Sequence, residues 1–154
     1  MKVLLATEGS EFSKAAIEKC CRMFAESVNT EIRIISAVEP TILPIEPFAV
    51  SADYIREINT AAHKQAGEVV SQAETEIHGL FPMLGVSLTT KVATGAPEQV
   101  IVEEAESWGA DLIIVGSHGY GLWQRTLLGS VSDRVAHHAP CSVLIVRRKN
   151  DSES

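Results

Sequence analysis

The chain has 154 residues, of which 45% are hydrophobic and 21% are charged. This length and composition are typical of one globular domain with its own core, which excludes a disordered chain. The 13 basic and 20 acidic side chains give a formal net charge of −7, so we expect no nucleic-acid partner. No segment approaches the roughly 18 consecutive apolar residues that a membrane span needs, so we also expect no membrane partner.

The three cysteines predict neither a disulfide framework nor a metal or redox motif. Cys20 and Cys21 are adjacent, and Cys141 lies far along the chain. We expect all three to be packing residues in a reducing compartment. The apolar run at the N-terminus is interrupted by Glu8, too early for a secretory signal. These features together favour a cytoplasmic location.

Five short apolar segments predict β-strands and alternate with helical patterns. The strands are expected at Val3–Thr7, Ile32–Val38, Leu88–Thr94, Asp111–Val115 and Ser142–Val146. The helices are expected to include Ile17–Phe24, Ile55–Leu80, Pro97–Trp108 and Ser130–His138, where apolar residues recur every three or four positions. Such alternation predicts an α/β fold, a doubly wound parallel sheet with helices on both faces. We expect one domain over residues 1–149 and a frayed tail at residues 150–154.

One segment departs from this compact plan. Residues 39–51 read EPTILPIEPFAVS, and Pro40, Pro44 and Pro47 prevent a helix there. The segment still carries several large apolar side chains. A long loop of this kind is often a lid or a contact surface, and the alternative is that its side chains fold back on the edge of the sheet. The sequence leaves both interpretations open.

Glycines and serines follow two of the predicted strands. Thr7-Glu8-Gly9-Ser10 ends the first, and the fourth leads into Gly116-Ser117-His118-Gly119 and, later, Gly129-Ser130-Val131-Ser132. Glycines let the backbone turn tightly and expose its N–H groups, and successive amides form an anion site. The start of a helix adds free amides and the positive end of its dipole. The pattern indicates a phosphate site, and the alternative is two ordinary turns with a serine cap.

Other phosphate and catalytic motifs do not fit. The sequence has neither a GxxxxGK[ST] loop nor a GxGxxG loop after the first strand. Gly116 directly precedes Ser117, so the GxSxG elbow of a Ser–His–Asp hydrolase is missing, and His118 is expected to pack or hydrogen-bond within the loop. His137 and His138 diverge on a helix without a third zinc ligand. We therefore predict neither catalytic nor metal-ligating side chains.

The spacing Gly116-x2-Gly119-x9-Gly129-Ser130 resembles the ATP-binding signature of the universal stress protein family, G-x2-G-x9-G-[ST]. The surrounding sequences DLIIVGSHG, LLGSVSDRV and APCSVLIVR are also similar to that family. The resemblance covers nearly the whole chain. It implies a five-stranded parallel sheet of order 3-2-1-4-5 and a cytoplasmic, stress-related nucleotide-binding protein.

The resemblance also implies which residues hold ATP, possibly with Mg²⁺ on its phosphates. The ribose and phosphates would lie against the loop, and Ala6, Thr7 and Ala37 would border the adenine. The cofactor-binding residues are expected to be Ala6, Thr7, Glu8, Ala37, Val115, Gly116, Gly119, Gly129, Ser130, Val131 and Ser132. Glu8 departs from the family, which usually has Asp there to bind the ribose hydroxyls. This extra methylene affects the affinity for ATP and the preference between ribo- and deoxyribonucleotides.

Three functional hypotheses follow. The first is a homodimer, paired through the strand at residues 142–146 as the resemblance implies, that binds ATP and changes its contacts with a protein partner. The second is a nucleotide-independent interaction module that acts through residues 39–51. The third is an ATPase or nucleotidyl-transfer enzyme, which is disfavoured because the sequence places no general base for water. At most, slow hydrolysis of ATP is expected.

Overall fold

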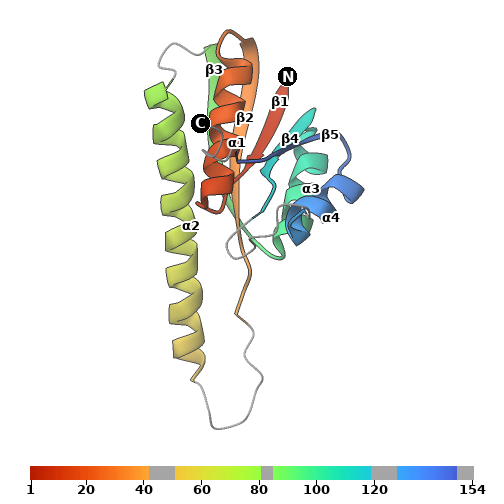
Figure 1. Cartoon of the computed structure of the whole chain (residues 1–154). Helices are drawn as coiled ribbons and strands as arrows, with labels where there is room; N and C mark the ends of the chain where they lie inside the picture. The colour runs from red at the N-terminus through yellow and green to blue at the C-terminus, as the bar shows by residue number, and fades with distance from the viewer. Residues whose placement is uncertain (42–50, 81–84, 119–127, 149–154) are drawn as a thin grey trace, which may run out of the picture.

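The computed structural model describes residues 1–41, 51–80, 85–118 and 128–148. Within these ranges the chain alternates strictly between strands and helices (Figure 1). The elements are β1 (Lys2–Ala6), α1 (Glu11–Phe24), β2 (Val28–Val38), α2 (Ala52–Leu80), β3 (Gly85–Thr94), α3 (Pro97–Trp108), β4 (Leu112–Gly116), α4 (Ser130–His138) and β5 (Ser142–Val146). Residues 42–50 of the proline-rich segment and the tail at 150–154 lie outside the described residues.

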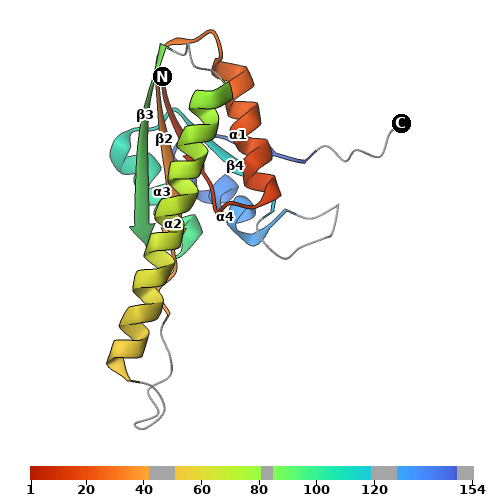
Figure 2. The same ribbon diagram turned by 90° about the vertical axis from the view of Figure 1, so that its left-hand side faces the viewer.

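The five strands form one parallel sheet in the order β3-β2-β1-β4-β5. This confirms the predicted fold class and strand order. Helices α1 and α2 cover one face of the sheet, and α3 and α4 cover the other (Figures 1 and 2). Two apolar cores result, one on each face, because the central strands are buried on both sides. β1 shows this most clearly, since Val3, Leu4 and Leu5 are all fully buried.

β2 and its neighbour β3 begin several residues earlier than their apolar patterns predict, β3 at Gly85 instead of Leu88. β2 starts at Val28 instead of Ile32, and its first residues are polar or exposed. Asn29 has a positive φ of 64°, and the register between β2 and β3 shifts between Val28 and Thr30. An irregularity of this kind breaks the alternation of buried and exposed side chains. The pairing with β3 therefore extends beyond the segment that hydrophobicity marks.

Helix α2 is longer than the sheet it covers. Its 29 residues span about 43 Å, and its first buried residue is Ala66. The N-terminal half extends beyond the carboxyl edge of the sheet (Figures 1 and 2). Two side-chain contacts fix this half near the ends of β2 and β3: the Thr41 N–H donates to Asn59 Oδ1 at 3.1 Å, and His63 Nε2 lies 3.1 Å from Thr94 Oγ1.

The cysteines behave as packing residues. Cys20 and Cys21 are free and buried between α1 and the sheet, and Cys141 is free and half-buried. Burial raises the pKa of the Cys20 thiol to about 12 and that of the Cys21 thiol to about 11. Both thiols therefore stay protonated and unreactive at neutral pH. In the described part of the chain, no helix has the length and apolarity that crossing a membrane requires.

A buried carboxylate joins α3 to strands β2 and β3 of the sheet. Glu104 is 6% exposed and receives hydrogen bonds from Arg33 of β2 and Lys91 of β3. Burial by itself raises the pKa of Glu104, but the hydrogen bonds and charges of the two cations outweigh it and hold this pKa below its usual value. The Arg33 guanidinium also lies 4.2 Å from the ring centre of Trp108. This cluster of Glu104, Arg33, Lys91 and Trp108 therefore connects α3 to β2 and β3 through side chains.

We predict that Glu104→Gln lowers the free energy of unfolding at pH 7 by about 1–3 kcal/mol, because two cations lose their buried counter-charge. The folded-state pKa lies below the unfolded value of about 4.3, so the contribution is complete above that pH and is lost as the pH falls through the folded-state pKa. Urea unfolding measured at neutral and acid pH should show the difference from wild type shrinking in acid. The exposed Glu106→Gln is the control, and an equal effect of both variants would contradict the assignment.

Candidate functional site

A cavity opens at the carboxyl ends of β1, β2 and β4, where ligands bind in open α/β sheets. Its volume is about 240 Å³. The walls come from the ends of these strands and from the first turns of α3 and α4. The lining residues are Ala6, Thr7, Glu8, Ile35, Ala37, Pro97, Ile101, Val115, Gly116, His118, Gly129, Ser130, Val131 and Ser132.

The cavity brings together ten of the eleven residues that the sequence predicts for nucleotide binding; the remaining one, Gly119, lies outside the described residues. Sequence reasoning missed four lining residues. Ile35, Pro97 and Ile101 are apolar and give no signal of their own beyond membership in a strand or helix. His118 was expected to pack or hydrogen-bond within the loop; it lies within hydrogen-bonding distance of Ser117, packs against Phe12 of α1 and also lines the cavity.

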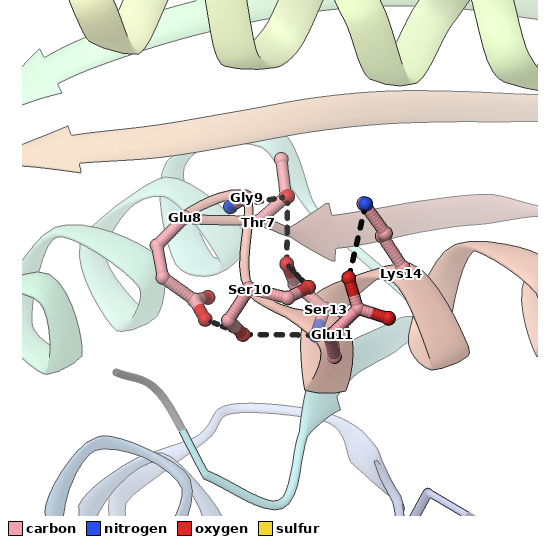
Figure 3. A network of polar contacts seen from close by, with 7 residues as sticks. All are labelled: Thr7, Glu8, Gly9, Ser10, Glu11, Ser13 and Lys14. Carbon is pink, nitrogen blue, oxygen red and sulfur yellow. Dashed lines mark hydrogen bonds and ion pairs between the residues drawn. The ribbon is translucent and has the colours of Figure 1, made fainter. Parts of the chain in front are cut away.

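The turn between β1 and α1 is held by its own hydrogen bonds (Figure 3). Thr7 Oγ1 accepts from the Gly9 N–H and donates to Ser13 Oγ, which in turn donates to the Ser10 carbonyl. Ser10 is the N-cap of α1, and its Oγ accepts from the Ser13 N–H. Gly9 provides the positive φ of 87° that the turn needs. The hydroxyls of this turn are therefore committed to the turn itself.

Glu8 is the one charged side chain that this turn brings to the cavity. Its Oε1 accepts a hydrogen bond from Ser10 Oγ, as Figure 3 shows. A carboxylate is an acceptor with negative charge, so this wall can accept from ligand hydroxyls and repels ligand phosphates. The β1–α1 side of the cavity is thus an accepting, anionic wall.

The glycine loop on the opposite side is closed by backbone and serine contacts. The Gly129 N–H donates to the Ser117 carbonyl at 2.8 Å, and Ser132 Oγ lies 3.0 Å from the carbonyl oxygens of both Ser117 and Gly129. A Cβ on Gly116 would lie 2.8 Å from the backbone of Phe12, and one on Gly129 would lie 3.2 Å from the backbone of Ser117 and His118. Gly116 is therefore needed for the close approach of β4 to α1, and Gly129 allows a tight contact between the two halves of the loop.

The N-terminus of α4 differs from that of α1 although both lie at the same edge of the sheet. Ser10 caps α1 with its side chain, whereas the N-cap of α4 is Gly129, which has no side chain to accept from the first-turn amides. The first intrahelical bond of α4 runs from the Asp133 N–H to the Gly129 carbonyl. The amides of residues 130–132 precede it and border the cavity. This end of α4 can donate several N–H groups to an anion.

An ion pair joins α3 and α4 near their N-termini. Arg134 of α4 donates to Glu98 of α3, one residue after the cavity-lining Pro97. A hydrogen bond from its own backbone amide, followed by the contact with Arg134, holds the pKa of Glu98 below its usual value. Glu98 therefore stays ionised over the physiological range. The pair connects the two helices whose first turns form one side of the cavity.

His118 is held between two neighbours. Its Nδ1 lies 3.1 Å from Ser117 Oγ, and its ring centre lies 5.2 Å from that of Phe12. Among the described residues, no hydrogen bond joins a carboxylate to His118, so Ser117 and His118 do not form part of a Ser–His–Asp arrangement. Within the same residues, no group of three metal-ligating side chains occurs.

Comparison with known proteins gives a consistent result. Residues 1–147 match the model of the universal stress protein family. The chain is also 31% identical, over 148 residues, to a universal stress protein of Methanocaldococcus jannaschii; the match covers 96% of this chain and 82% of that protein.

Two solved structures share the fold. One is a universal stress protein in complex with cAMP, which is 28% identical with a TM-score of 0.63. The match covers 95% of this chain and 96% of that protein's chain. The other, a universal stress family protein from Arabidopsis thaliana with AMP bound, has a TM-score of 0.65 over 100% of this chain and 96% of its own. At 20% identity, that second likeness supports the fold alone.

We predict that Ser132→Ala lowers stability by about 1 kcal/mol, or about 2–4 °C in Tm, because the loop loses the hydroxyl that joins its two halves. The loss stays moderate because Ser117 and Gly129 carbonyls keep their backbone donors. Ser130→Ala, at an exposed position on the same turn, should change stability by less than about 0.5 kcal/mol. Thermal unfolding of the two variants tests this, and equal losses would show that Ser132 does not join the loop.

Proposed function

This chain belongs to the universal stress protein family, and from that premise we propose that it binds an adenine nucleotide, principally ATP, in the cavity at the carboxyl edge of the sheet. One related structure is that of a universal stress protein in complex with cAMP. The observation that carries the proposal is the contrast between two helix N-termini, of which α1 is capped by its own serine and α4 is not.

The phosphates are proposed to lie at the start of α4. Gly129 leaves the amides of Ser130, Val131 and Ser132 without a side-chain cap, and the helix dipole favours negative charge there. Hydrogen bonds to charged groups contribute about 1.5–3 kcal/mol each. Ser130 is exposed and adds a hydroxyl, whereas the Ser132 hydroxyl is committed to the loop carbonyls. Mg²⁺, if bound, would be held by the phosphates.

The base is proposed to lie on the apolar part of the cavity. Ile35, Ala37, Pro97 and Ile101 provide flat contact without a side-chain hydrogen bond. The Thr7 N–H makes the last bond of β1 to β2, to the Ile35 carbonyl at 2.9 Å. Backbone groups of alternate residues in a strand point toward the same neighbouring strand. Ala37 lies two residues after Ile35, so its N–H and carbonyl also point toward the β1 side, at a level beyond the end of β1. One donor and one acceptor there suit the edge of an adenine.

Glu8 is proposed to set the orientation of the nucleotide. Its carboxylate can accept from ribose hydroxyls, and it repels phosphates from the β1–α1 side. The donors of α4 lie on the other side of the same cavity. A nucleotide is therefore oriented with its ribose toward Glu8 and its phosphates toward Ser130.

The chain is proposed to form a homodimer through β5. In a stress response, the nucleotide-bound dimer would contact a protein partner. β5 is an outer strand of the sheet, and its residues Val143–Val146 are only half-buried. An apolar outer strand is a template for pairing with another chain, and a twofold mate covers it.

We predict that Ser130→Asp weakens ATP binding by about tenfold or more, which corresponds to about 1.4 kcal/mol. The new carboxylate lies at the first residue of α4, where its interaction with the helix dipole stabilises the helix and where it repels phosphate. Stability should therefore stay equal or increase while affinity falls. Calorimetric titration with ATP, together with thermal unfolding, measures both quantities.

Ser130→Asn is the matched control, since it has the size of aspartate without the charge. It should retain most of the affinity for ATP. Adenosine, which has no phosphate, should bind Ser130→Asp and wild type equally. Loss of ATP affinity in both variants, or in neither, would contradict a phosphate site at α4.

For the β5 dimer, we predict that Val143→Pro shifts the protein toward monomer, whereas Val143→Ala does so less. The Val146 carbonyl accepts from the Ser117 N–H, so the backbone groups of Val146 point toward β4. By alternation the N–H of Val143 points away from β4. Proline at position 143 therefore removes this outward N–H without breaking a hydrogen bond of the sheet. Both variants lose similar packing. Sedimentation velocity measures the shift, and identical profiles for the two variants would exclude pairing through this edge.

A further inference from the structure

The sheet has a second outer strand, β3, which the nucleotide site and the β5 edge do not involve. β3 has ten residues, twice as many as β5. It pairs with β2 along its whole length, from Gly85 to Thr94. In the described part of the chain, no strand pairs with its other side, and Figure 2 shows β3 as the outermost strand.

The direction of the backbone groups of β3 follows from its ladder. The Gly95 N–H donates to the Val38 carbonyl, so the odd-numbered residues of β3 direct their N–H and carbonyl groups toward β2. The even-numbered residues direct theirs outward. These are Val86, Leu88, Thr90, Val92 and Thr94. The outer side of β3 therefore presents a regular row of donors and acceptors.

This edge lacks the features that keep outer strands from pairing. The segment GVSLTTKVAT contains no proline, and its single charged side chain is Lys91. The Lys91 ammonium is already paired with Glu104 of its own chain. Natural edges are usually protected by proline, by unpaired charges or by a bulge on the outer side. Val86, Leu88 and Val92 are also only half-buried against α2, so a neighbour would cover more of their surface.

We propose that β3 is a docking edge for a second copy of this chain, paired antiparallel about a twofold axis at Thr90. In this register Thr90 lies opposite its own mate, Leu88 opposite Val92, and Val86 opposite Thr94. All of these are outward-facing positions, so each pair exchanges two backbone hydrogen bonds. Nine residues of each strand, Val86–Thr94, are used.

The side chains are self-complementary in this register. On the face toward α2, the pairs are threonine with threonine and leucine with valine, which stabilise antiparallel sheets. On the other face, Lys91 lies opposite Thr89 and Ser87 opposite Ala93. No like charges face each other directly. This symmetry is the reason a second copy, and not an unrelated extended peptide, is the occupant that fits.

The β3 contact differs from the proposed β5 dimer and is independent of the nucleotide. A chain that pairs through both edges forms assemblies larger than a dimer as concentration rises, because each added copy presents another free edge. A chain that pairs through β3 alone forms only a dimer. Loss of the β3 contact therefore changes assembly and leaves ATP affinity unchanged.

Disulfide trapping tests the proposal and its register. In a hydrogen-bonded antiparallel pair the two Cα atoms lie about 5.5 Å apart, within the range for a disulfide. Thr90→Cys should therefore give covalent dimers when oxidised glutathione is added. Ser87→Cys is the control: its twofold mate lies six residues away along the strand, about 20 Å, so it should give no more dimer than wild type.

A second pair of variants tests the backbone contact without oxidant. Thr90→Pro removes an outward N–H, which an outer strand tolerates, and Thr90→Val keeps it. Sedimentation across a concentration series should show stronger association for wild type and Thr90→Val than for Thr90→Pro, which keeps only the contact proposed for β5. Equal trapping of Thr90→Cys and Ser87→Cys, or no trapping of Thr90→Cys above wild type, would overturn the proposal. Neither result bears on ATP binding, which the Ser130 variants test separately.

Discussion

The site depends on backbone amides at the start of α4 that no side-chain cap occupies and that can therefore donate to a ligand. Helix N-termini are usually capped by a side chain that accepts from the first turn, as Ser10 does in α1. In α4 the cap is Gly129, where an added Cβ would lie only 3.2 Å from the backbone of Ser117 and His118. The polar groups that the loop does require are provided by Ser132, which lies deeper and joins the loop carbonyls. The loop is thus held in place without using the amides that an anion needs.

The cavity is chemically divided as a consequence. Donors lie on the α4 side, an acceptor with negative charge lies at Glu8, and apolar side chains of β2 and α3 lie between them. A ligand with a flat base, hydroxyls and an anionic tail matches these three parts in one orientation. The Glu98–Arg134 ion pair connects α3 to α4. It therefore holds the apolar residues of α3 in position relative to the N–H donors of α4. Affinity for each part of a ligand can therefore be changed separately by substitution.

The two outer strands are built differently. β5 is short and apolar, whereas β3 is long, rich in threonine and carries one charged side chain, Lys91, which is paired with Glu104. The Glu104 carboxylate, which also pairs with Arg33, thereby holds the one charged side chain of β3 in an ion pair. The proposed β3 contact is thus linked to core packing through one buried carboxylate.

The sequence by itself determined the alternation of strands and helices, the doubly wound class and most of the cavity. These follow from local signals: the period of apolar residues, Pro97 at a helix start, and glycines at fixed spacing. Even there, the polar start of β2 and the first residues of α2 were missed. Long-range pairing with β3 extends β2, and Ser51, whose Oγ accepts from the Tyr54 N–H, starts α2 three residues before Ile55.

Only the tertiary structure decided which polar groups are free. Ser130 and Ser132 look alike in the sequence, yet one is exposed and the other is 3% exposed and bonded to Ser117, fifteen residues earlier. Likewise, Ile35 and Ile101 line the cavity only because β2 and α3 meet there. Spacing along the chain fixes the local conformation, but a hydroxyl's partner depends on which distant segment the fold brings within about 3 Å of it.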